Sequence, residues 1–329
     1  MPKSIPTIHD VAKAAGVSIA TVSYALNGTG RVSDATAQKV QAAISKIGYQ
    51  PNRQAAALKT KRTHTIGAIV RTIQTEDISK TWTNISSEVL YRASAEFLKR
   101  GYSLVLIPNT NLNSVRTLSV DGLVVSDSLQ DDPAFDLAQK LGIPVGTNER
   151  PDDKRVTLNM NNGYWPMTIA ALDHLKEKGA KKIGLLTEPA ELHSDFRVER
   201  AYLEWCEKNN VKPIVEHGNY SKTNTAECLK NVLAKNVDAI YSYYEQGPEI
   251  LQILNDLGYK VPNDIMLIAA TASDDQENRS LGISSVVYHP TEQVEEFMQN
   301  LIDLIEGKQE GPISMSTPWE LNLYKSTKD

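Results

Sequence analysis

Residues 7–28 read TIHDVAKAAGVSIATVSYALNG, the pattern of two short helices joined by a tight turn. Thr7 and Asp10 have the spacing of a capping box, in which the side chain at each position bonds the backbone of the other. Apolar residues recur behind them at helical spacing as far as Gly16, which suits the left-handed position after a helix. Ser18 then begins a second helix. Two helices joined by a glycine-containing turn predict a helix-turn-helix, a unit that enters the major groove of DNA.

The second helix separates an inward face from an outward face. Val22, Ala25 and Leu26 fall on one side, where they can pack against the first helix. The outward side includes Ile19, whose apolar side chain suits a thymine methyl group better than water. A third helix, from residue 33 or 34 to 47, completes the core, and a three-helix module that binds nothing is the alternative. The DNA contacts expected from this unit are Thr7, Ser18, Ile19, Ala20, Thr21, Ser23, Tyr24 and Asn27.

Charge is distributed unevenly along the chain. Residues 1–63 hold nine Lys and Arg against two Asp, whereas the remaining residues hold 26 cations and 38 anions. A basic segment attached to an acidic body is typical of a nucleic-acid-binding domain joined to a separate domain. A chance excess of surface lysines is the alternative, and the helix-turn-helix pattern favours the first interpretation.

Residues 50–63 are predicted to form a hinge helix or linker after a DNA-binding domain that spans residues 1–49. Asn52 is a good N-cap and the alanines favour helix, but isolated helices shorter than about 12 residues are marginal in water. Leu58 is an apolar wedge among cations, an arrangement that suits insertion at a minor-groove step. We therefore expect Asn52, Ala55 and Leu58 to contact DNA, with a plain flexible linker as the alternative.

Beyond residue 64 the pattern alternates between strand and helix. Repeated βα units predict a mainly parallel sheet with helices on both faces, and a segment this long fits two lobes better than one sheet. Small ligands then bind at the carboxyl ends of the strands, in the cleft between the lobes. The expected strands are 66–70, 102–107, 122–125, 183–186, 239–243, 265–269 and 285–288, and the expected helices include 85–99, 164–178, 197–209 and 248–257.

Short motifs of the basic segment stand in a characteristic order: TIHDVA at 7–12, AGVS at 15–18, TVS at 21–23, LNG at 26–28 and GYQPN at 48–52. With Leu58 beyond them, they resemble the head of a LacI/GalR-family transcriptional regulator. The resemblance implies that the second helix reads the major groove and that Leu58 is the intercalating hinge leucine. It also implies that two subunits, a homodimer, bind a near-palindromic double-stranded DNA operator.

Two residues depart from the family's pattern. Tyr24 stands where the family usually has arginine, and Ala57 stands where arginine or glutamine is common. A phenol cannot make the bidentate bond that arginine makes to a guanine edge. We therefore expect unusual operator bases opposite Tyr24.

The resemblance continues more weakly through VDGL at 120–123, GIPV at 142–145 and VPNDI at 261–265. It implies an N-terminal all-α helix-turn-helix domain followed by an α/β two-lobed periplasmic-binding-protein-like domain that binds an effector and dimerises. This domain spans residues 64–329. Its first lobe is expected at about 64–162 and 291–319, and its second at about 163–290 and 320–329.

Effector-contacting positions follow from the same resemblance. Asn162 is an alternative to Asn161, and Arg200 is an alternative to Arg197. Thr271 replaces an aspartate, which removes a strong acceptor for sugar hydroxyls. The expected effector is a small polar molecule, a sugar or sugar derivative, although a non-carbohydrate ligand or none stays open. The expected contacts are Arg71, Trp82, Asn161, Ser194, Arg197, Tyr220, Tyr244, Glu245 and Thr271, the aromatic residues and Arg197 having ordinary core or surface roles as alternatives.

Signatures of catalysis are absent from the sequence. It has no P-loop, no zinc-protease motif, no nucleophile elbow and no dinucleotide fingerprint, and its six histidines are scattered. The two cysteines form no metal-spaced cluster. We expect no enzyme activity, no metal and no cofactor.

The first residues show no signal peptide and no segment is apolar enough to span a membrane, so a cytoplasmic protein is expected. No heptad tail follows residue 324, which favours a dimer over a tetramer. Two other functions stay open: a regulator controlled by a protein partner instead of a metabolite, and a solute-binding protein for transport.

Overall fold

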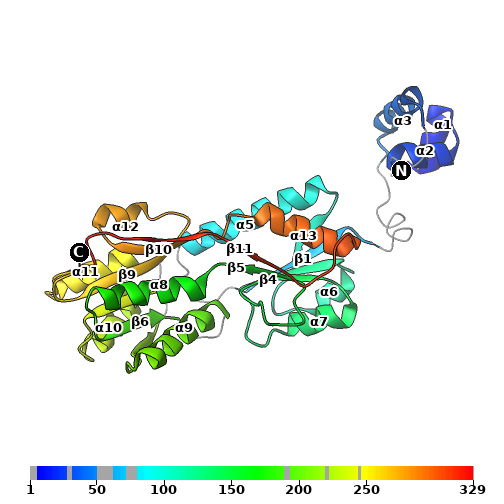
Figure 1. Ribbon diagram of the computed structural model, residues 1–329. Coiled ribbons are helices and arrows are strands. Elements are labelled where there is room, and N and C mark those ends of the chain that lie inside the picture. The colour runs from blue at the N-terminus through cyan, green and yellow to red at the C-terminus, as the bar shows by residue number, and fades with distance from the viewer. Residues whose placement is uncertain are drawn as a thin grey trace. The chain divides into compact units, whose positions relative to one another are not determined.

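The computed structural model describes residues 6–27, 32–49, 62–71, 80–188, 193–218, 222–243 and 246–328, apart from the side chains of residues 27, 80–86, 193–195 and 222–223. The chain divides into two compact units, residues 1–63 and residues 64–329 (Figure 1). None of the helices in these ranges has the length and apolar character needed to cross a membrane.

The smaller unit is a three-helix module made of α1 (Ile8–Ala15), α2 (Ile19–Asn27) and α3 (Asp34–Ile47). Asp10 accepts hydrogen bonds from the backbone N–H and the hydroxyl of Thr7, at 2.8 and 2.7 Å, so it reaches back to the N-cap as predicted. Gly16 takes a left-handed conformation (φ 67°) at the end of α1. Val11, Val22 and Val40 bury their side chains in the small core between the helices. The predicted helix-turn-helix fold is confirmed.

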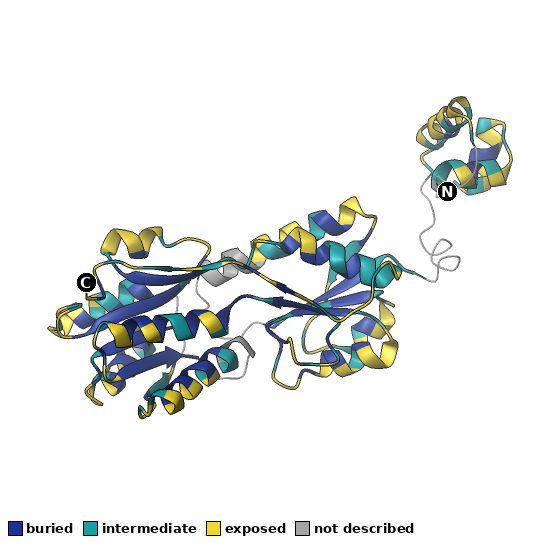
Figure 2. Ribbon diagram, viewed as in Figure 1, coloured by how far each residue is buried: buried dark blue, intermediate teal, exposed yellow. Residues whose placement is uncertain are grey.

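The larger unit contains two six-stranded sheets, each forming a lobe with helices on both faces (Figures 1 and 2). The first sheet has the order β11-β5-β4-β3-β1-β2 and only parallel neighbours. Apolar side chains of α5 and α13 cover one face, and those of α6 and α7 cover the other. Its elements are β1 (Thr65–Val70), α5 (Lys80–Lys99), β2 (Ser103–Leu106), α6 (Asn113–Thr117), β3 (Gly122–Ser126), α7 (Pro133–Leu141), β4 (Val145–Asn148), β5 (Leu158–Asn161), α13 (Val294–Glu306) and β11 (Ile313–Ser316).

The second sheet has the order β12-β10-β9-β8-β6-β7, and only the pair of β10 and β12 is antiparallel. Helices α8 and α9 pack on one face, and α10 and α11 pack on the other. Its elements are α8 (Tyr164–Glu177), β6 (Ile183–Thr187), α9 (His193–Asn209), β7 (Val215–His217), α10 (Lys222–Leu233), β8 (Ala239–Ser242), α11 (Gly247–Asp256), β9 (Met266–Ala272), α12 (Gln276–Leu281), β10 (Ser284–Tyr288) and β12 (Trp319–Asn322).

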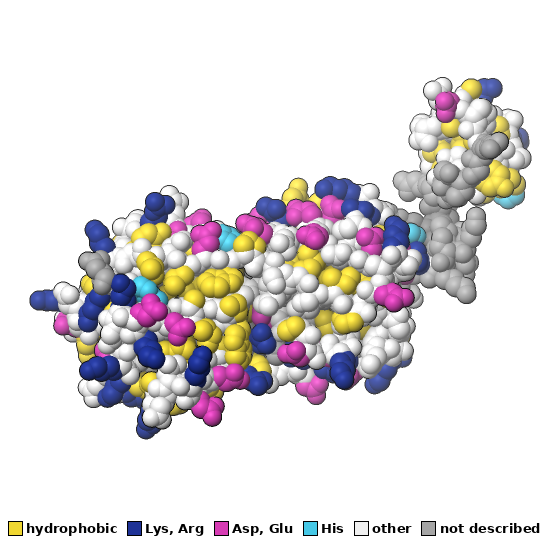
Figure 3. Space-filling view, viewed as in Figure 1, with side chains coloured by type: hydrophobic (Ala, Val, Ile, Leu, Met, Phe, Trp, Pro, Cys, Tyr) yellow, Lys and Arg dark blue, Asp and Glu magenta, His cyan; other side chains and the backbone are white. Residues whose placement is uncertain are grey.

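The chain passes between the two sheets three times: after β5, after β10 and after β11. All seven strands expected from the sequence are present, with ends shifted by a few residues, and β4, β5, β7, β11 and β12 were not expected. The predicted α/β two-lobed fold is confirmed. On the face shown in Figure 3, cationic and anionic side chains of this unit are interspersed and form no block of one sign.

Candidate functional site

Helix α2 presents an exposed face that includes large apolar side chains. Ile19 is 41% exposed and Tyr24 is 48% exposed, whereas Val22 is fully buried. Ser18 caps the helix, because its Oγ accepts a hydrogen bond from the backbone N–H of Thr21 at 3.1 Å. The orientation predicted for α2 is therefore confirmed. Of the other expected DNA contacts, Thr7 and Ala20 are exposed, Thr21 and Ser23 are half-buried, and the side chain of Asn27 together with Asn52, Ala55 and Leu58 lies outside the described residues.

Three buried carboxylates in the larger unit directly follow strands. Asp127 follows β3, Glu149 follows β4 and Glu188 follows β6. Since these strands belong to two sheets, the carboxyl ends of both lobes contribute to one acidic region. Asp127 and Glu149 also take left-handed backbone conformations, with φ of 50° and 59°, which are uncommon for residues other than glycine.

Glu149 connects the two lobes through its carboxylate. One oxygen accepts a hydrogen bond from the backbone N–H of Asn162, and the other lies 3.7 Å from Nε of Arg197 on α9. Within the described residues, neither that second oxygen nor Arg197 Nε has a hydrogen-bond partner, although both are buried. Burial raises the pKa of Glu149 to about 7, despite the opposing effects of Asn162 and Arg197. A polar group placed between these two atoms would satisfy both.

The other two carboxylates lie close enough to repel each other. Asp127 accepts hydrogen bonds from the hydroxyl of Ser126 at 2.9 Å and from the amide nitrogen of Asn148 at 3.1 Å, but burial still raises its pKa. Burial, and secondly the charge of Asp127, raises the pKa of Glu188 to about 7. The cleft therefore favours ligand groups that donate hydrogen bonds or carry positive charge.

Tyrosine rings form an apolar wall beside these carboxylates. The ring of Tyr164, at the start of α8, contacts Tyr243 and Tyr288 edge-on, with centroids 5.5 Å away in each case. Its hydroxyl lies 3.4 Å from the side-chain nitrogen of Asn162. Burial raises the pKa of Tyr164 well above its ordinary value, so this hydroxyl stays protonated.

A cavity of about 790 Å3 opens between the lobes beside Arg197. Residues 150–155 of the first lobe line one side, and Trp165, Phe196, Arg197, Arg200 and Glu204 of the second lobe line the other. The Arg197 guanidinium lies over the Trp165 ring at 5.3 Å, whereas exposed Arg200 pairs with Glu204 one helical turn away. Of the two candidate arginines, the structure brings Arg197 to the carboxylate of the opposite lobe.

The remaining expected effector contacts fall into two groups: residues that are already bonded within the protein, and residues that lie outside the described part of the chain. Buried Arg71 makes a bidentate ion pair with Asp132 inside the first lobe. Asn161 accepts a hydrogen bond from the backbone N–H of Gly163, and the Thr271 hydroxyl donates to the backbone carbonyl of Asp274. These bonds occupy groups that a ligand would otherwise use. Tyr220, Tyr244, Glu245 and the side chains of Trp82 and Ser194 lie outside the described residues.

Sequence reasoning missed Asp127, Glu149, Glu188, Tyr164 and Trp165. A usable signal was present for Asp127 and Glu188, because Glu188 stands directly after a run of β-branched and apolar residues and Asp127 stands one residue beyond such a run. Glu149 follows a strand that itself went unpredicted, so its position gave no such signal.

Comparisons with known proteins agree with this architecture. Residues 7–52 match the family described as bacterial regulatory proteins, lacI family, and residues 172–327 match the periplasmic binding protein-like domain. A transcriptional repressor named PurR from Photobacterium profundum is 30% identical over 285 residues, 80% of each chain. A transcriptional regulator named CelR from Thermobifida fusca is 26% identical over 343 residues, 98% of each chain.

Solved structures share the fold over nearly the whole chain. A lac repressor dimer bound to operator and the anti-inducer ONPF gives a TM-score of 0.79 at 21% identity, covering 98% of this chain and 99% of that one. A CelR–cellobiose complex gives a TM-score of 0.67 at 22% identity, with the same coverage.

A helix-turn-helix unit joined to a two-lobed periplasmic-binding-protein-like domain defines a DNA-binding transcriptional regulator, not an enzyme. The chain belongs to the LacI family of bacterial regulatory proteins.

Proposed function

We propose that this protein is a repressor that binds a palindromic operator as a homodimer and responds to a small, polar, carbohydrate-like effector held between its lobes. As a DNA-binding regulator it acts in the cytoplasm. Support for operator binding comes from the exposed apolar face of α2 and the basic charge of residues 1–63. The lac repressor relative whose structure includes operator is a dimer, which supports the proposed assembly.

The observation that carries effector control is the contact between Glu149 and Arg197. Each belongs to a different lobe, and the two facing atoms are buried, 3.7 Å apart and without a hydrogen bond to any other described residue. A ligand hydroxyl between them donates to the carboxylate and accepts from the guanidinium, so it holds the lobes at one separation. A ligand shifts a conformational equilibrium only by binding one conformation more tightly than the other. A ligand that bonds both lobes favours the conformation with that lobe separation, and this change in the larger unit can alter the spacing of the two DNA-binding units of a dimer.

The chemistry of the cleft favours a neutral or cationic effector. Buried Asp127 and Glu188 add to the negative charge of Glu149, and Arg197 is the cation that faces Glu149 from the opposite lobe. Carboxylates accept strong hydrogen bonds from hydroxyl groups, and the ring of Tyr164 supplies an apolar surface for a sugar face. Cellobiose bound to CelR is an example of such a ligand in a relative with the same fold.

Leu58→Ala tests the DNA-binding mechanism. An operator sequence is first selected from random duplexes with the purified protein. We expect the variant to lose specific affinity by at least about 100-fold, toward the nonspecific level, while remaining a dimer in sedimentation, because the wedge that offsets base unstacking is gone. Leu257→Ala, at an exposed site of the larger unit, is the matched control. Undiminished operator affinity in the Leu58 variant rejects the hinge mechanism.

Arg197→Gln tests the effector site, with Lys208→Gln, at an exposed position of the same helix, as its matched control. A thermal-shift screen of sugars, amino sugars and nucleosides identifies a stabilising ligand. We expect the Arg197 variant to need at least about tenfold more of that ligand, since one charge-assisted bond is lost, and the Lys208 variant to respond as the unmodified protein does. Equal responses of the two variants contradict the site.

Two other functions predict different outcomes. A regulator controlled by a protein partner shows no stabilisation by any metabolite and co-purifies with that partner. A solute-binding protein for transport keeps its whole function when the operator-binding unit is inactivated by Leu58→Ala, and it shows no preference for any duplex.

A further inference from the structure

Two of the buried cleft carboxylates, those of Asp127 and Glu188, form no ion pair within the described part of the chain. Asp127 is 7% exposed and follows β3 of the first lobe, whereas Glu188 is 4% exposed and follows β6 of the second. Burial, and secondly the charge of Asp127, raises the pKa of Glu188, so the two carboxylates repel each other across the cleft. A group that relieves this repulsion acts on both lobes.

Arginines at the cleft do not relieve it, because each faces another carboxylate. The pairs are Arg71 with Asp132, Arg150 with Asp153, and Arg197 with Glu149. The side chains of this unit outside the described set, in segments 72–86, 189–195, 219–223 and 244–245, include five Asp or Glu and two Lys, so they supply no excess of cations. Negative charge therefore exceeds positive charge at the cleft.

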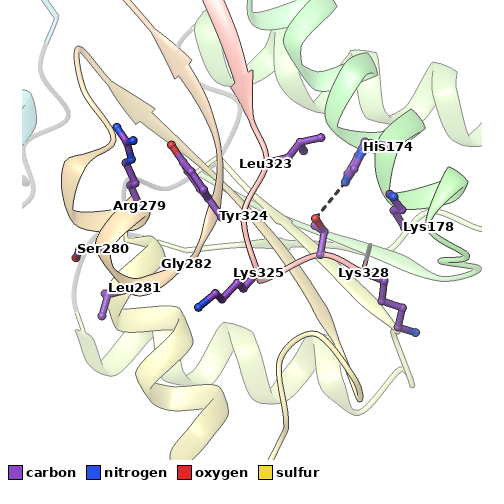
Figure 4. A pocket seen from close by; sticks show the side chains of 11 residues that line it. His174, Lys178, Arg279, Ser280, Leu281, Gly282, Leu323, Tyr324, Lys325 and Lys328 are labelled. Atoms are coloured by element: carbon purple, nitrogen blue, oxygen red, sulfur yellow. Dashed lines mark hydrogen bonds between the residues drawn. The ribbon is translucent and has the colours of Figure 1, made fainter.

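Other cations of the second lobe lie around a separate cavity of about 460 Å3, and the charged ends of its four Lys and Arg point apart (Figure 4). Tyr164 begins α8 at the cleft, and Lys178, one of these four, directly follows the end of that helix. The 14 residues of α8 span about 20 Å, which exceeds the screening length of about 10 Å at 0.1 M salt. These cations do not balance the cleft carboxylates.

The surroundings of the two carboxylates suit an organic cation better than a metal ion. Among the described side chains, no three His, Cys, Asp or Glu are arranged to hold a metal. Tyrosine rings stand beside the carboxylates instead: Tyr243 directly follows β8, the neighbour of β6, and its ring contacts that of Tyr164. Carboxylates next to aromatic rings form an environment that binds ammonium groups, through hydrogen bonds and through attraction to the ring faces.

We propose that the effector is a hydroxylated amine, such as an amino sugar, whose ammonium group lies between Asp127 and Glu188. Its hydroxyl groups reach the unsatisfied atoms of Glu149 and Arg197. An ammonium group has three donors, so one group bonds carboxylates of both lobes and replaces their repulsion with attraction. This class of effector is assigned to the same cleft and therefore depends on the proposed function.

Matched pairs of an amine and an alcohol test the charge of the effector. The full-length chain is titrated with glucamine or sorbitol, and with ethanolamine or ethylene glycol, with sodium chloride holding the ionic strength equal. Melting is followed by tryptophan fluorescence, since all four tryptophans lie in the larger unit. At about pH 8 we expect each amine to half-saturate at a concentration at least about tenfold lower than its alcohol.

The preference for the amine should depend on ionised Glu188. At about pH 5.5 it should shrink, because a carboxyl with a pKa of about 7 is then protonated. Glu188→Gln keeps the shape and an acceptor oxygen, so at about pH 8 it should show the weak preference that the unmodified protein shows at the lower pH. Glu227→Gln, at an exposed position of α10, is the matched control and should keep the full preference. Each variant is measured against its own ligand-free melting temperature.

Three results overturn the ammonium group: equal half-saturation by amine and alcohol, no stabilisation by either amine, or the same preference in Glu188→Gln and Glu227→Gln. The proposed function fails separately. A neutral ligand that stabilises the protein and depends on Arg197 leaves effector control intact while it removes the amine.

Discussion

Glu188 is a buried carboxylate that forms no ion pair within the described part of the chain, and it makes stability depend on pH. Its pKa is raised to about 7 by burial and by Asp127, above the ordinary value of 4.5. Between these two values the folded chain holds a proton that the unfolded chain has released, so stability falls as the pH rises through about 7. Asp127 and Glu149 act in the same direction, since the pKa of each is also raised.

Replacing Glu188 with glutamine should remove the part of the pH dependence of stability that comes from this carboxylate. Between pH 5.5 and pH 8.5 the unmodified protein should lose about 2 kcal/mol more stability than the Glu188→Gln variant. Urea unfolding followed by tryptophan fluorescence at both values of pH measures the difference, and Glu227→Gln, at an exposed position of α10, is the control. If Glu188→Gln and Glu227→Gln show the same change in stability with pH, the carboxylate of Glu188 is either exposed or paired with another group.

Residue contacts at the candidate site were the least predictable feature. Arg71 and Asp132 are 61 residues apart, and Glu149 and Arg197 are 48 apart, so neither pairing leaves a local pattern in the sequence. Burial of Asp127 and Glu188 also depends on two sheets that meet only after folding. Position at a strand end is readable from sequence, whereas the partner of a side chain is not.

Helix α2 provides a test that separates stability from DNA binding. Ser18 caps this helix through the backbone N–H of Thr21 and is itself exposed. Ser18→Ala should cost about 1 kcal/mol in the stability of the smaller unit. Ser18→Asp keeps a capping oxygen, so it should preserve that stability, but its negative charge faces DNA phosphates and should reduce operator affinity at least about tenfold.

Hydrogen exchange of amides in residues 8–47 of the full chain measures stability, and fluorescence anisotropy measures affinity for the selected operator. Ser33→Asp, at the N-cap of α3, is the matched control because it introduces the same charge at another helix start. Should Ser18→Asp bind DNA as tightly as Ser33→Asp, the start of α2 does not face the duplex.

Elements with strong local signals were predictable, and short polar ones were not. The helix-turn-helix follows from the caps at Thr7 and Ser18, the glycine after α1 and apolar spacing, all within a few residues. By contrast, β4 and β5 have four residues each and include polar side chains such as Asn148 and Asn159. Their strand conformation is imposed by pairing with neighbours, which overrides weak local preference.

Over the whole molecule, charge is segregated between the parts of the chain. The net charge is -5, which taken alone would predict repulsion from DNA, yet residues 1–63 carry nine Lys and Arg against two acidic residues. Salt screens charges beyond about 10 Å at 0.1 M, so cations that touch phosphates outweigh acidic residues elsewhere in the chain. Local contacts should therefore control DNA affinity.

Operator affinity should consequently fall steeply with salt. If about half of the cations in two basic segments neutralise phosphates, the logarithm of the association constant should decline against the logarithm of salt concentration with a slope of about -8. Anisotropy titrations from about 50 to 200 mM salt measure this slope for the unmodified protein and for Lys208→Gln, whose charge lies outside the basic segment and should leave the slope unchanged. The affinity for the effector should change little over the same range of salt concentration, because the charged groups proposed to bind it are buried and poorly screened. A slope near zero would mean that the basic segment does not contact the phosphate backbone, since counterion release accompanies every such contact regardless of sequence.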